Sequence, residues 1–279
     1  MPPKAPHIAL PPQPDGVIEI NKQLGLSVVD LKKIVAVIQK DPALTAKVLK
    51  VANSPLFCCG RSIDSVTRAV QVMGLNNFRT VVVNVALREV FSQGDSEVLE
   101  KFWKHSELAA LSCDIIARQM VNRLAPQAYL HGLFHDCAIP IMANKYPDYA
   151  ELIQKSLHYQ ENVIALEEER YFTNHCTLGY FFAKSWALPE LVCAAIQQHH
   201  NESLADIEEE DVKLLVAISQ VSEFIIQDFD SSGNMKTISI EIWAERHDNA
   251  MQILGIEPDH IRDFEEELLE KMNETIGSR

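Results

Sequence analysis

Histidines and one adjacent carboxylate are the residues of this chain whose types and spacing point most directly to chemistry. A His-Asp doublet stands at His135 and Asp136, and a His-His pair stands at His199 and His200. Imidazole nitrogen and carboxylate oxygen are good ligands for zinc, iron, manganese and nickel, and a helical bundle brings such ligands together from separate helices. The candidate ligands are His105, His135, Asp136, His175, His199 and His200, with His131 as an additional candidate.

A second interpretation of these histidines stays open. A histidine inside a helical bundle is commonly a core residue that is hydrogen-bonded to backbone or to a neighbour, without any metal. His131 precedes His135 by four residues and so lies on the same helical face, where it is either an extra ligand or a packing residue. The metal hypothesis makes one geometric prediction, which is that the candidate side chains surround a common pocket.

The elements that must position these residues are helices. Proline and glycine are scarce after residue 16, and apolar residues recur three and four apart, as in Leu31, Ile34, Val35 and Ile38. The β-branched stretch 80–85 has no strand partner of similar character nearby, so a buried helix is expected there. Helices are expected over 43–52, 65–73, 77–91, 97–122, 127–144, 146–157, 164–171, 174–185, 189–199, 212–227, 244–254 and 258–276. The sequence therefore predicts an all-α protein of two bundles, with an N-terminal subdomain at 1–94 and a larger bundle with a C-terminal helical extension at 95–279.

Composition excludes several classes of function. The 279 residues include 25 Lys and Arg against 39 Asp and Glu, so the formal charge of -14 disfavours binding to nucleic acid or anionic lipid. The longest apolar stretch falls far short of the roughly 20 residues that a membrane helix needs, and no apolar signal core stands at the N-terminus. A cytoplasmic protein is expected. The six cysteines form no C-x-x-C pair, so reduced thiols are expected rather than disulfides or cysteine-based zinc.

Several short motifs follow one another in a specific order. They include Asp41-Pro42-Ala43-Leu44, Met73-Gly74-Leu75, Gly132-Leu133-Phe134-His135-Asp136 and Trp186-Ala187-Leu188-Pro189, with His105, His175 and His199-His200 in between. This order resembles the HDOD family, an output domain related to the HD-type metal-dependent phosphohydrolases. The resemblance covers residues 10–225 or so, and it implies an all-α fold with a small amino-terminal bundle beside an HD-like bundle.

The resemblance also implies roles for residues. In active HD hydrolases a histidine, a His-Asp doublet, further histidines and a last aspartate hold one or two metals that activate water against a phosphoester. Here Gln220 stands where the last aspartate is expected, and Ile139 stands where a phosphate-facing lysine would follow the doublet. A neutral amide offers a weaker oxygen and no charge, so a degenerate site is expected, with iron, manganese, nickel or zinc at low occupancy.

These features favour a signal-transduction module that binds a protein partner or a small regulatory ligand without robust catalysis. The alternative is a metal-dependent phosphohydrolase that acts on a nucleotide or cyclic dinucleotide. The missing aspartate and lysine favour the first hypothesis, and the retained histidines with Asp136 favour the second.

Overall fold

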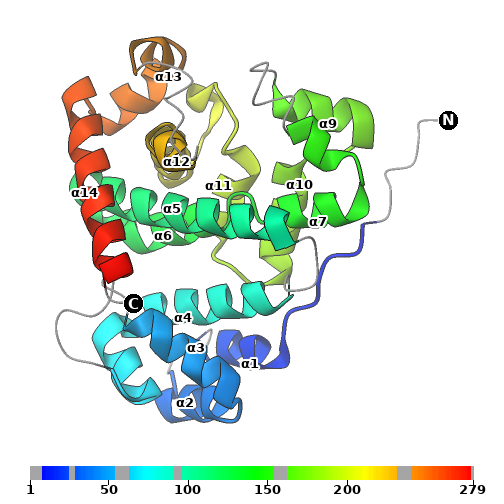
Figure 1. Ribbon diagram of the computed structural model, residues 1–279, viewed down its shortest axis with the longest axis vertical. Helices are drawn as coiled ribbons and strands as arrows, with labels where there is room; N and C mark the ends of the chain where they lie inside the picture. Colours follow the sequence, from blue (N-terminus) through cyan, green and yellow to red (C-terminus); the bar gives the residue numbers. More distant parts are fainter. Residues whose placement is uncertain are drawn as a thin grey trace. The chain divides into compact units, whose positions relative to one another are not determined.

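The structure is a computed structural model, and it describes residues 8–24, 29–53, 63–90, 96–153, 162–230 and 240–277. Every element in the described part of the chain is a helix (Figure 1), so the predicted all-α class is confirmed. None of these helices is both long enough and apolar enough to cross a bilayer. The chain divides into two compact units, of which the larger joins Met1–Pro11 to Gly94–Glu265 and the smaller joins Pro12–Gln93 to Glu266–Arg279.

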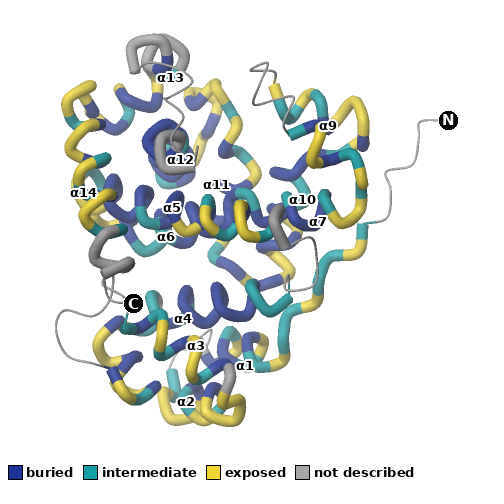
Figure 2. Tube along the Cα trace, in the orientation of Figure 1, coloured by how far each residue is buried: buried dark blue, intermediate teal, exposed yellow. Residues whose placement is uncertain are grey.

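The described residues in the N-terminal part of the smaller unit form four helices. They are α1 (Asp15–Leu24), α2 (Leu31–Gln39), α3 (Pro42–Ala52) and α4 (Val66–Val90). α3 packs along α4, and α1 contacts both α2 and α4. α4 is interrupted at Gly74, whose φ of 74° is left-handed, so the two helices expected on either side of this glycine are both present. Residues 80–87 of α4 are all buried (Figure 2), as expected for a buried helix rather than a strand.

Short polar side chains set the ends of these helices. Asp30 caps α2 by accepting from the Lys32 amide at 3.0 Å, and Asp41 accepts from the Leu44 amide at 3.0 Å at the start of α3. Asn53 closes α3 by donating to the carbonyl oxygens of Leu49 and Ile63 and accepting from the Ile63 amide. This side chain therefore ties the end of α3 to the segment that leads into α4.

The larger unit is a bundle around α5 and α12. Its helices are α5 (Ser96–Met120), η1 (Asn122–Leu124), α6 (Ala125–Phe134), α7 (Ile139–Lys145), α9 (Val163–Tyr171), α10 (His175–Ser185), α11 (Glu190–Gln198), η2 (Leu204–Asp206), α12 (Glu210–Asp230), α13 (Ile240–Leu254) and the first part of α14 (Pro258–Gly277). α12 packs against α5, α6, α11 and α13, and α10 packs on α11. Residues 214–222 of α12 are all buried (Figure 2), so this helix runs through the core.

α5 and α6 make the most extensive helix pair, and Gly132 permits their close approach. A Cβ atom at this glycine would lie 2.5 Å from the carbonyl oxygen of Ala109 and 2.7 Å from its carbon. Both atoms belong to the α5 backbone and cannot rotate away. Only glycine therefore fits at this crossing.

The prediction of a single helix over 127–144 is wrong. α6 ends at Phe134, residues 135–138 form a turn, and α7 begins at Ile139. Pro140 explains the break, because proline has no amide hydrogen for the preceding turn and its ring clashes with a continuing helix. The His135–Asp136 doublet consequently lies at the break. Residues 91 and 154–157, where two expected helices would continue, lie outside the described residues.

Candidate metal centre

Four segments of the larger unit place the predicted ligands. His105 lies on α5, the doublet His135 and Asp136 follows α6, and His175 is the first residue of α10. His199 and His200 follow the last residue of α11. Asn174 caps α10 by accepting from the Thr177 amide at 2.7 Å, which fixes the point at which His175 enters the helix.

Asp136 lies between two pairs of histidines. Its Oδ2 is 3.3 Å from Nε2 of His135 and 3.9 Å from Nε2 of His105. Its Oδ1 is 3.4 Å from Nε2 of His175 and 3.4 Å from Nε2 of His199. The structure thus brings the side chains of His105, His135, Asp136, His175 and His199 together in one cluster.

Glu223 of α12 adds a second carboxylate, which the sequence analysis missed. Its Oε1 is 3.2 Å from Nε2 of His105 and 3.2 Å from Nε2 of His135. Gln220, the expected stand-in for the acidic residue, instead donates from its Nε2 to the Asn201 carbonyl at 2.8 Å. Glu223 follows Gln220 by three residues and so shares its helical face, which was the available sequence signal. α12 therefore does supply an acidic group, one turn later than expected.

Hydrogen bonds on the far side of three imidazoles aim their Nε2 atoms into the cluster. Nδ1 of His135 is 2.8 Å from the Gly132 carbonyl, and Nδ1 of His199 is 2.8 Å from the Ile196 carbonyl. Nδ1 of His175 is 2.8 Å from Oε2 of Glu167. Because oxygen acceptors hold a proton on each Nδ1, Nε2 is the nitrogen of each ring that is left to coordinate a cation.

Glu167 of α9 is a second residue that the sequence analysis missed. Its side chain is fully buried and accepts from the His175 amide at 2.9 Å and from the Tyr149 hydroxyl at 2.5 Å. A buried carboxylate behind a histidine is the usual outer partner of a metal-ligating imidazole. No feature of the spacing between residues 167 and 175 revealed it, because the contact depends on how α9 folds back on α10.

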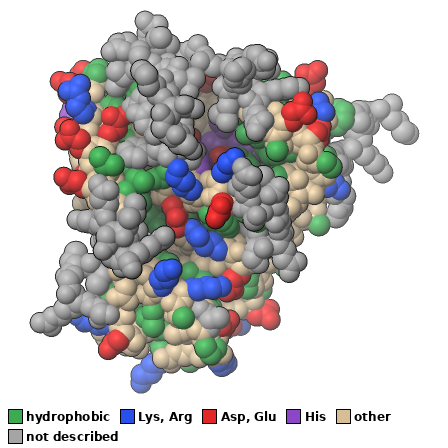
Figure 3. Space-filling model, viewed as in Figure 1, with side chains coloured by type: hydrophobic (Ala, Val, Ile, Leu, Met, Phe, Trp, Pro, Cys, Tyr) green, Lys and Arg blue, Asp and Glu red, His purple; other side chains and the backbone are tan. Residues whose placement is uncertain are grey.

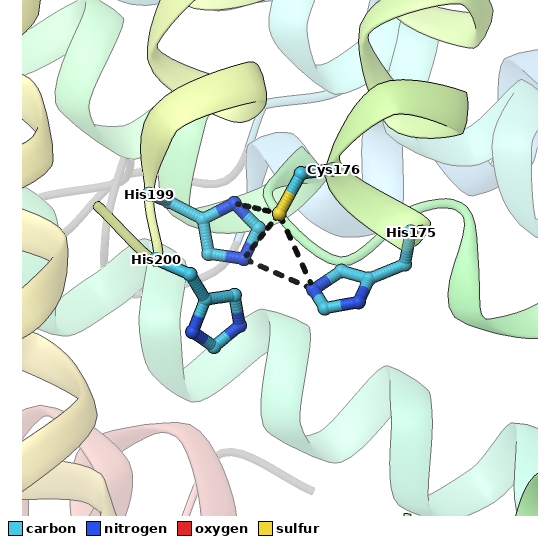
Figure 4. A group of neighbouring side chains, drawn as sticks. All are labelled: His175, Cys176, His199 and His200. Carbon is cyan, nitrogen blue, oxygen red and sulfur yellow. Dashed lines mark hydrogen bonds between the residues drawn. The ribbon is translucent and has the colours of Figure 1, made fainter. Parts of the chain in front are cut away.

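Cys176 is the third residue near the cluster that the sequence analysis missed. Figure 4 shows its sulfur between the rings of His175 and His199, with His200 beside them. Sγ of Cys176 is 3.7 Å from Nε2 of His175 and 3.6 Å from Nδ1 of His199. His200 is exposed, and its ring centroid lies 4.3 Å from that of His199. The sequence analysis expected reduced thiols and no cysteine-based zinc, so it did not predict this contact.

Two further sequence candidates lie apart from the cluster's donor atoms. His131 is completely buried, its ring centroid is 6.3 Å from that of His135, and neither of its nitrogens has a hydrogen-bond partner among the described residues. Ile139 packs against the apolar cluster that contains Met142 and Tyr149. Its side chain is half-buried and apolar, so it offers no charge to a ligand.

Charge and burial act in opposite directions on the pKa values in the cluster. Burial lowers the pKa of His135, but Asp136 and Glu223 outweigh it and raise the value to about 9. Burial likewise opposes the raised pKa of His199, which Cys176 and Asp136 bring to about 10. The pKa values of Asp136 and Glu223 are lowered by the neighbouring histidines despite burial. The cluster is therefore a network of mutually stabilising opposite charges.

The donor atoms fall into two groups that fit divalent ions. One group consists of His105, His135 and Asp136, and the other consists of His175, Cys176, His199 and His200, with the donor atoms of each group within 4.8 Å of one another. Oδ1 of Asp136 is buried and has no hydrogen-bond donor in the described part of the chain, so a cation would satisfy it. The nitrogen and carboxylate donors suit zinc, iron or manganese.

The first of these groups reaches the surface. The side chains of Asp136, His105 and Glu223 are 14%, 20% and 38% exposed, whereas that of His175 is 1% exposed. Histidine surface is visible between acidic and basic side chains on the face drawn in Figure 3. The side of the cluster that carries His105 and Glu223 is therefore its more exposed side.

Comparisons with known proteins show the family to which this chain is similar. The family model described as the HDOD domain matches residues 10–202. An uncharacterised protein of Treponema pallidum (strain Nichols) is 25% identical over 195 residues, which are 69% of this chain and 38% of that protein. The uncharacterised protein YuxH of Bacillus subtilis (strain 168) is 26% identical over 117 residues, which are 42% of this chain and 28% of that protein. The chain thus spans well under half the length of these relatives.

Solved structures share the fold. An HDOD domain protein of unknown function from Geobacter sulfurreducens has a TM-score of 0.69 at 23% identity, covering 97% of this chain and 91% of that one. A Shewanella amazonensis SB2B protein, provisionally named a phosphohydrolase, has a TM-score of 0.73 at 20% identity and covers 95% and 92%. A Marinobacter aquaeolei VT8 protein, provisionally named a signal transduction protein, has a TM-score of 0.70 at 19% identity and covers 96% and 59%.

Proposed function

Since the chain belongs to the HDOD family, we propose that it is a signal-transduction module whose histidine and carboxylate cluster holds divalent metal ions and binds a small anionic regulatory ligand. The observation that carries this proposal is the position of Asp136, whose two oxygens each face a pair of imidazole Nε2 atoms. A carboxylate between four imidazoles, with one buried oxygen that lacks a hydrogen-bond donor among the described residues, is better explained by cations than by core packing.

The buried and the accessible residues of such a site have different roles. His135, His175 and His199 are held rigidly by hydrogen bonds at Nδ1, so they provide a preorganised donor set. His105 and Glu223 lie at the accessible side, where they face an entering ligand. When bound, a divalent ion supplies positive charge that attracts and polarises the oxygen atoms of an anionic ligand. The protein fixes where that oxygen must lie.

The residues that follow the His135–Asp136 doublet favour ligand binding without robust turnover. Ile139 occupies the position where the family resemblance implies a phosphate-facing lysine, and its half-buried side chain packs against the apolar cluster that contains Met142 and Tyr149. Phosphoryl transfer needs positive charge on the equatorial oxygens as the transition state develops. Two carboxylates, Asp136 and Glu223, lie beside the accessible histidines instead.

One observation favours a second function, that of a metal-dependent phosphohydrolase. Glu223 contributes the α12 carboxylate that Gln220 does not provide, and it contacts both His105 and His135. With this residue the donor set contains an acidic group at each of the two segments where the resemblance implies one. The substrate class in this case is a nucleotide or cyclic dinucleotide.

One set of measurements tests the proposal and separates it from the second function. Protein without a histidine tag is analysed for metal, titrated with manganese, iron, nickel and zinc, and assayed with phosphomonoesters and cyclic dinucleotides. Metal that is retained by the wild type and lost in Asp136→Ala, without turnover above background, supports the binding module. Turnover that Asp136→Ala and Glu223→Gln both abolish would establish the hydrolase instead, and a wild type that binds no divalent ion would exclude both.

A further inference from the structure

Cys176 has surroundings unlike those of the other buried cysteines. Sγ of Cys193 donates to the Leu188 carbonyl at 3.6 Å, and Sγ of Cys137 donates to the Gly179 carbonyl at 3.9 Å, so each has a backbone oxygen as its acceptor. Sγ of Cys176 instead lies among imidazole nitrogens, 3.7 Å from His175 Nε2 and 4.0 Å from His199 Nε2. All three groups are buried and point toward one another (Figure 4).

In both imidazoles Nε2 is the nitrogen that is left to face the cluster. Each Nδ1 is engaged by an oxygen acceptor, Glu167 for His175 and the Ile196 carbonyl for His199. The two Nε2 atoms are 3.4 Å apart, so in their neutral forms two lone pairs face each other. Two lone pairs and a sulfur at one buried point are held together best by a cation.

The separations match those expected around a tetrahedral ion. Zinc bonds of about 2.3 Å to sulfur and about 2.0–2.1 Å to nitrogen give edges of about 3.4 Å between nitrogens and about 3.6 Å between sulfur and nitrogen. The observed edges are 3.4 Å between the nitrogens of His175 and His199, and 3.7 and 4.0 Å from Cys176 Sγ to these nitrogens.

Asp136 completes the set. Its Oδ1 is 3.4 Å from each of the two Nε2 atoms, the edge that bonds of about 2.0–2.2 Å to oxygen would produce. The same oxygen is buried and has no hydrogen bond from any described residue. The start of α10, the end of α11 and the turn after α6 therefore all contribute donor atoms that contact the facing Nε2 atoms of His175 and His199. His200 lies at the exposed side of this group.

We propose that Cys176 is a thiolate ligand of the inner metal ion, together with His175, His199 and Asp136, and that this ligand set selects zinc. This inference rests on the proposed function, because it names the metal and a new ligand of the same centre. A soft sulfur ligand favours zinc over manganese or magnesium, which prefer all-oxygen or oxygen-rich sites. Binding transfers the thiol proton to solvent, since only the thiolate coordinates.

Cobalt(II) substitution of the metal-free full chain tests the inference. Cobalt reports a sulfur ligand by a near-ultraviolet charge-transfer absorption that oxygen and nitrogen ligands do not give. We expect this band in the wild type and in Cys193→Ser, a matched buried cysteine, and we expect its loss in Cys176→Ser. Zinc affinity, measured by competition with a chelating dye, should fall at least about tenfold in Cys176→Ser. Manganese binding beside His105 and Glu223 should change less than about twofold, because thiolate sulfur is not a ligand of that position.

The outcomes separate this inference from the proposed function. Wild-type protein that binds cobalt or zinc without the sulfur band overturns the role of Cys176 and leaves the metal-binding module intact. A band that persists in Cys176→Ser, or that disappears in Cys193→Ser, also overturns it. Wild-type protein that binds no divalent ion overturns both. The wild-type spectrum requires no variant, so the test does not depend on whether a substituted chain folds.

Discussion

Asp136 connects the two pairs of histidines in the cluster. Each of its oxygens faces two imidazole nitrogens, and all of these side chains except His105 are almost completely buried. An isolated charge in such a position is costly, so Asp136 and its histidines stabilise one another through opposite charge in the absence of metal. Replacing one member therefore affects the whole group.

At the residue scale, we expect Glu223→Ala to weaken binding of the ion beside His105 at least about tenfold. The side chain lies 3.2 Å from two of the imidazole nitrogens in that half of the cluster, so its loss removes negative charge next to the cation. Isothermal titration with manganese measures the effect. Gln220→Ala is the control, because Gln220 donates to the Asn201 carbonyl instead. Equal losses in the two variants would contradict the role given to Glu223.

His131 allows a sharp test of whether a buried histidine is a ligand or a packing residue. We expect His131→Leu to retain the full metal content and to leave the free energy of unfolding unchanged or raise it by about 1–2 kcal/mol. The reason is that both nitrogens are buried without a hydrogen-bond partner in the described chain, which costs stability that an apolar side chain avoids. Elemental analysis and urea unfolding measure the two quantities. Metal loss in this variant would make His131 a ligand.

The pKa values of His135 and His199 predict how the metal-free protein responds to pH. Both are raised in the folded state, to about 9 and about 10, from about 6.5 in an unfolded chain. The stabilisation is therefore complete below about pH 6.5 and is lost as the pH rises through about 9–10. We expect the urea midpoint in the presence of chelator to fall over this window and the fall to be smaller in Asp136→Asn. A midpoint that stays constant or rises would refute this assignment.

At the scale of elements, the approach of α5 to α6 determines whether His105 and His135 meet. Gly132 permits this approach, and its carbonyl also accepts from Nδ1 of His135. The rings of His105 and His135 lie 5.5 Å apart across the helix pair. A single small residue therefore serves both the packing of the bundle and the orientation of a ligand.

We expect Gly132→Ala to lower the free energy of unfolding by about 1–3 kcal/mol or more, because the added methyl group meets the α5 backbone at 2.5 Å. Gly16→Ala is the matched control in α1, where the nearest atoms to the added carbon are 3.9 Å away and belong to side chains. That change should be neutral or slightly stabilising. Urea unfolding compares the two variants, and similar costs in both would argue against the close approach.

Local signals in the sequence predicted much of the helical architecture. Gly74 separates two helical segments and Asn174 caps α10, as expected, because a glycine or a capping side chain acts within its own turn. The break at residues 135–138 was missed, although Pro140 pointed to it, because the apolar periodicity continues across the turn. The helix α1 was also not predicted from the sequence.

The candidate site was predictable only in part. His105, the doublet and the later histidines were recognised by residue type and order, and the structure brings them together. Glu167, Cys176 and Glu223 were missed because their roles depend on contacts between helices that are far apart in the chain. Periodicity gives the face of a helix, but it does not give the partner that this face meets.

At the scale of the whole molecule, every residue of the cluster belongs to the larger of the two units. We expect zinc to slow amide hydrogen exchange in α6, α10, α11 and α12 and to leave α1, α2 and α3 unchanged. Binding to the native state alone raises the free energy of opening by about 2.7 kcal/mol at a hundredfold excess over Kd, and only for openings that break the site. Mass spectrometry with and without zinc measures this. Equal protection in α1–α3 would show that the two units open together.

Exposure falls across the cluster, from 38% for the side chain of Glu223 and 20% for His105 to 4% for His199 and 1% for His175. In the proposed centre, an ion beside Glu223 would exchange with solvent directly, whereas an ion beside the buried His175 would leave only through a local opening of the helices around it. The residence time of the inner ion is then set by the rate of that local opening and not by affinity alone. The two positions would therefore exchange metal at different rates. The occupancy of the outer position would follow the current concentration of free metal, whereas the occupancy of the inner position would still reflect an earlier concentration.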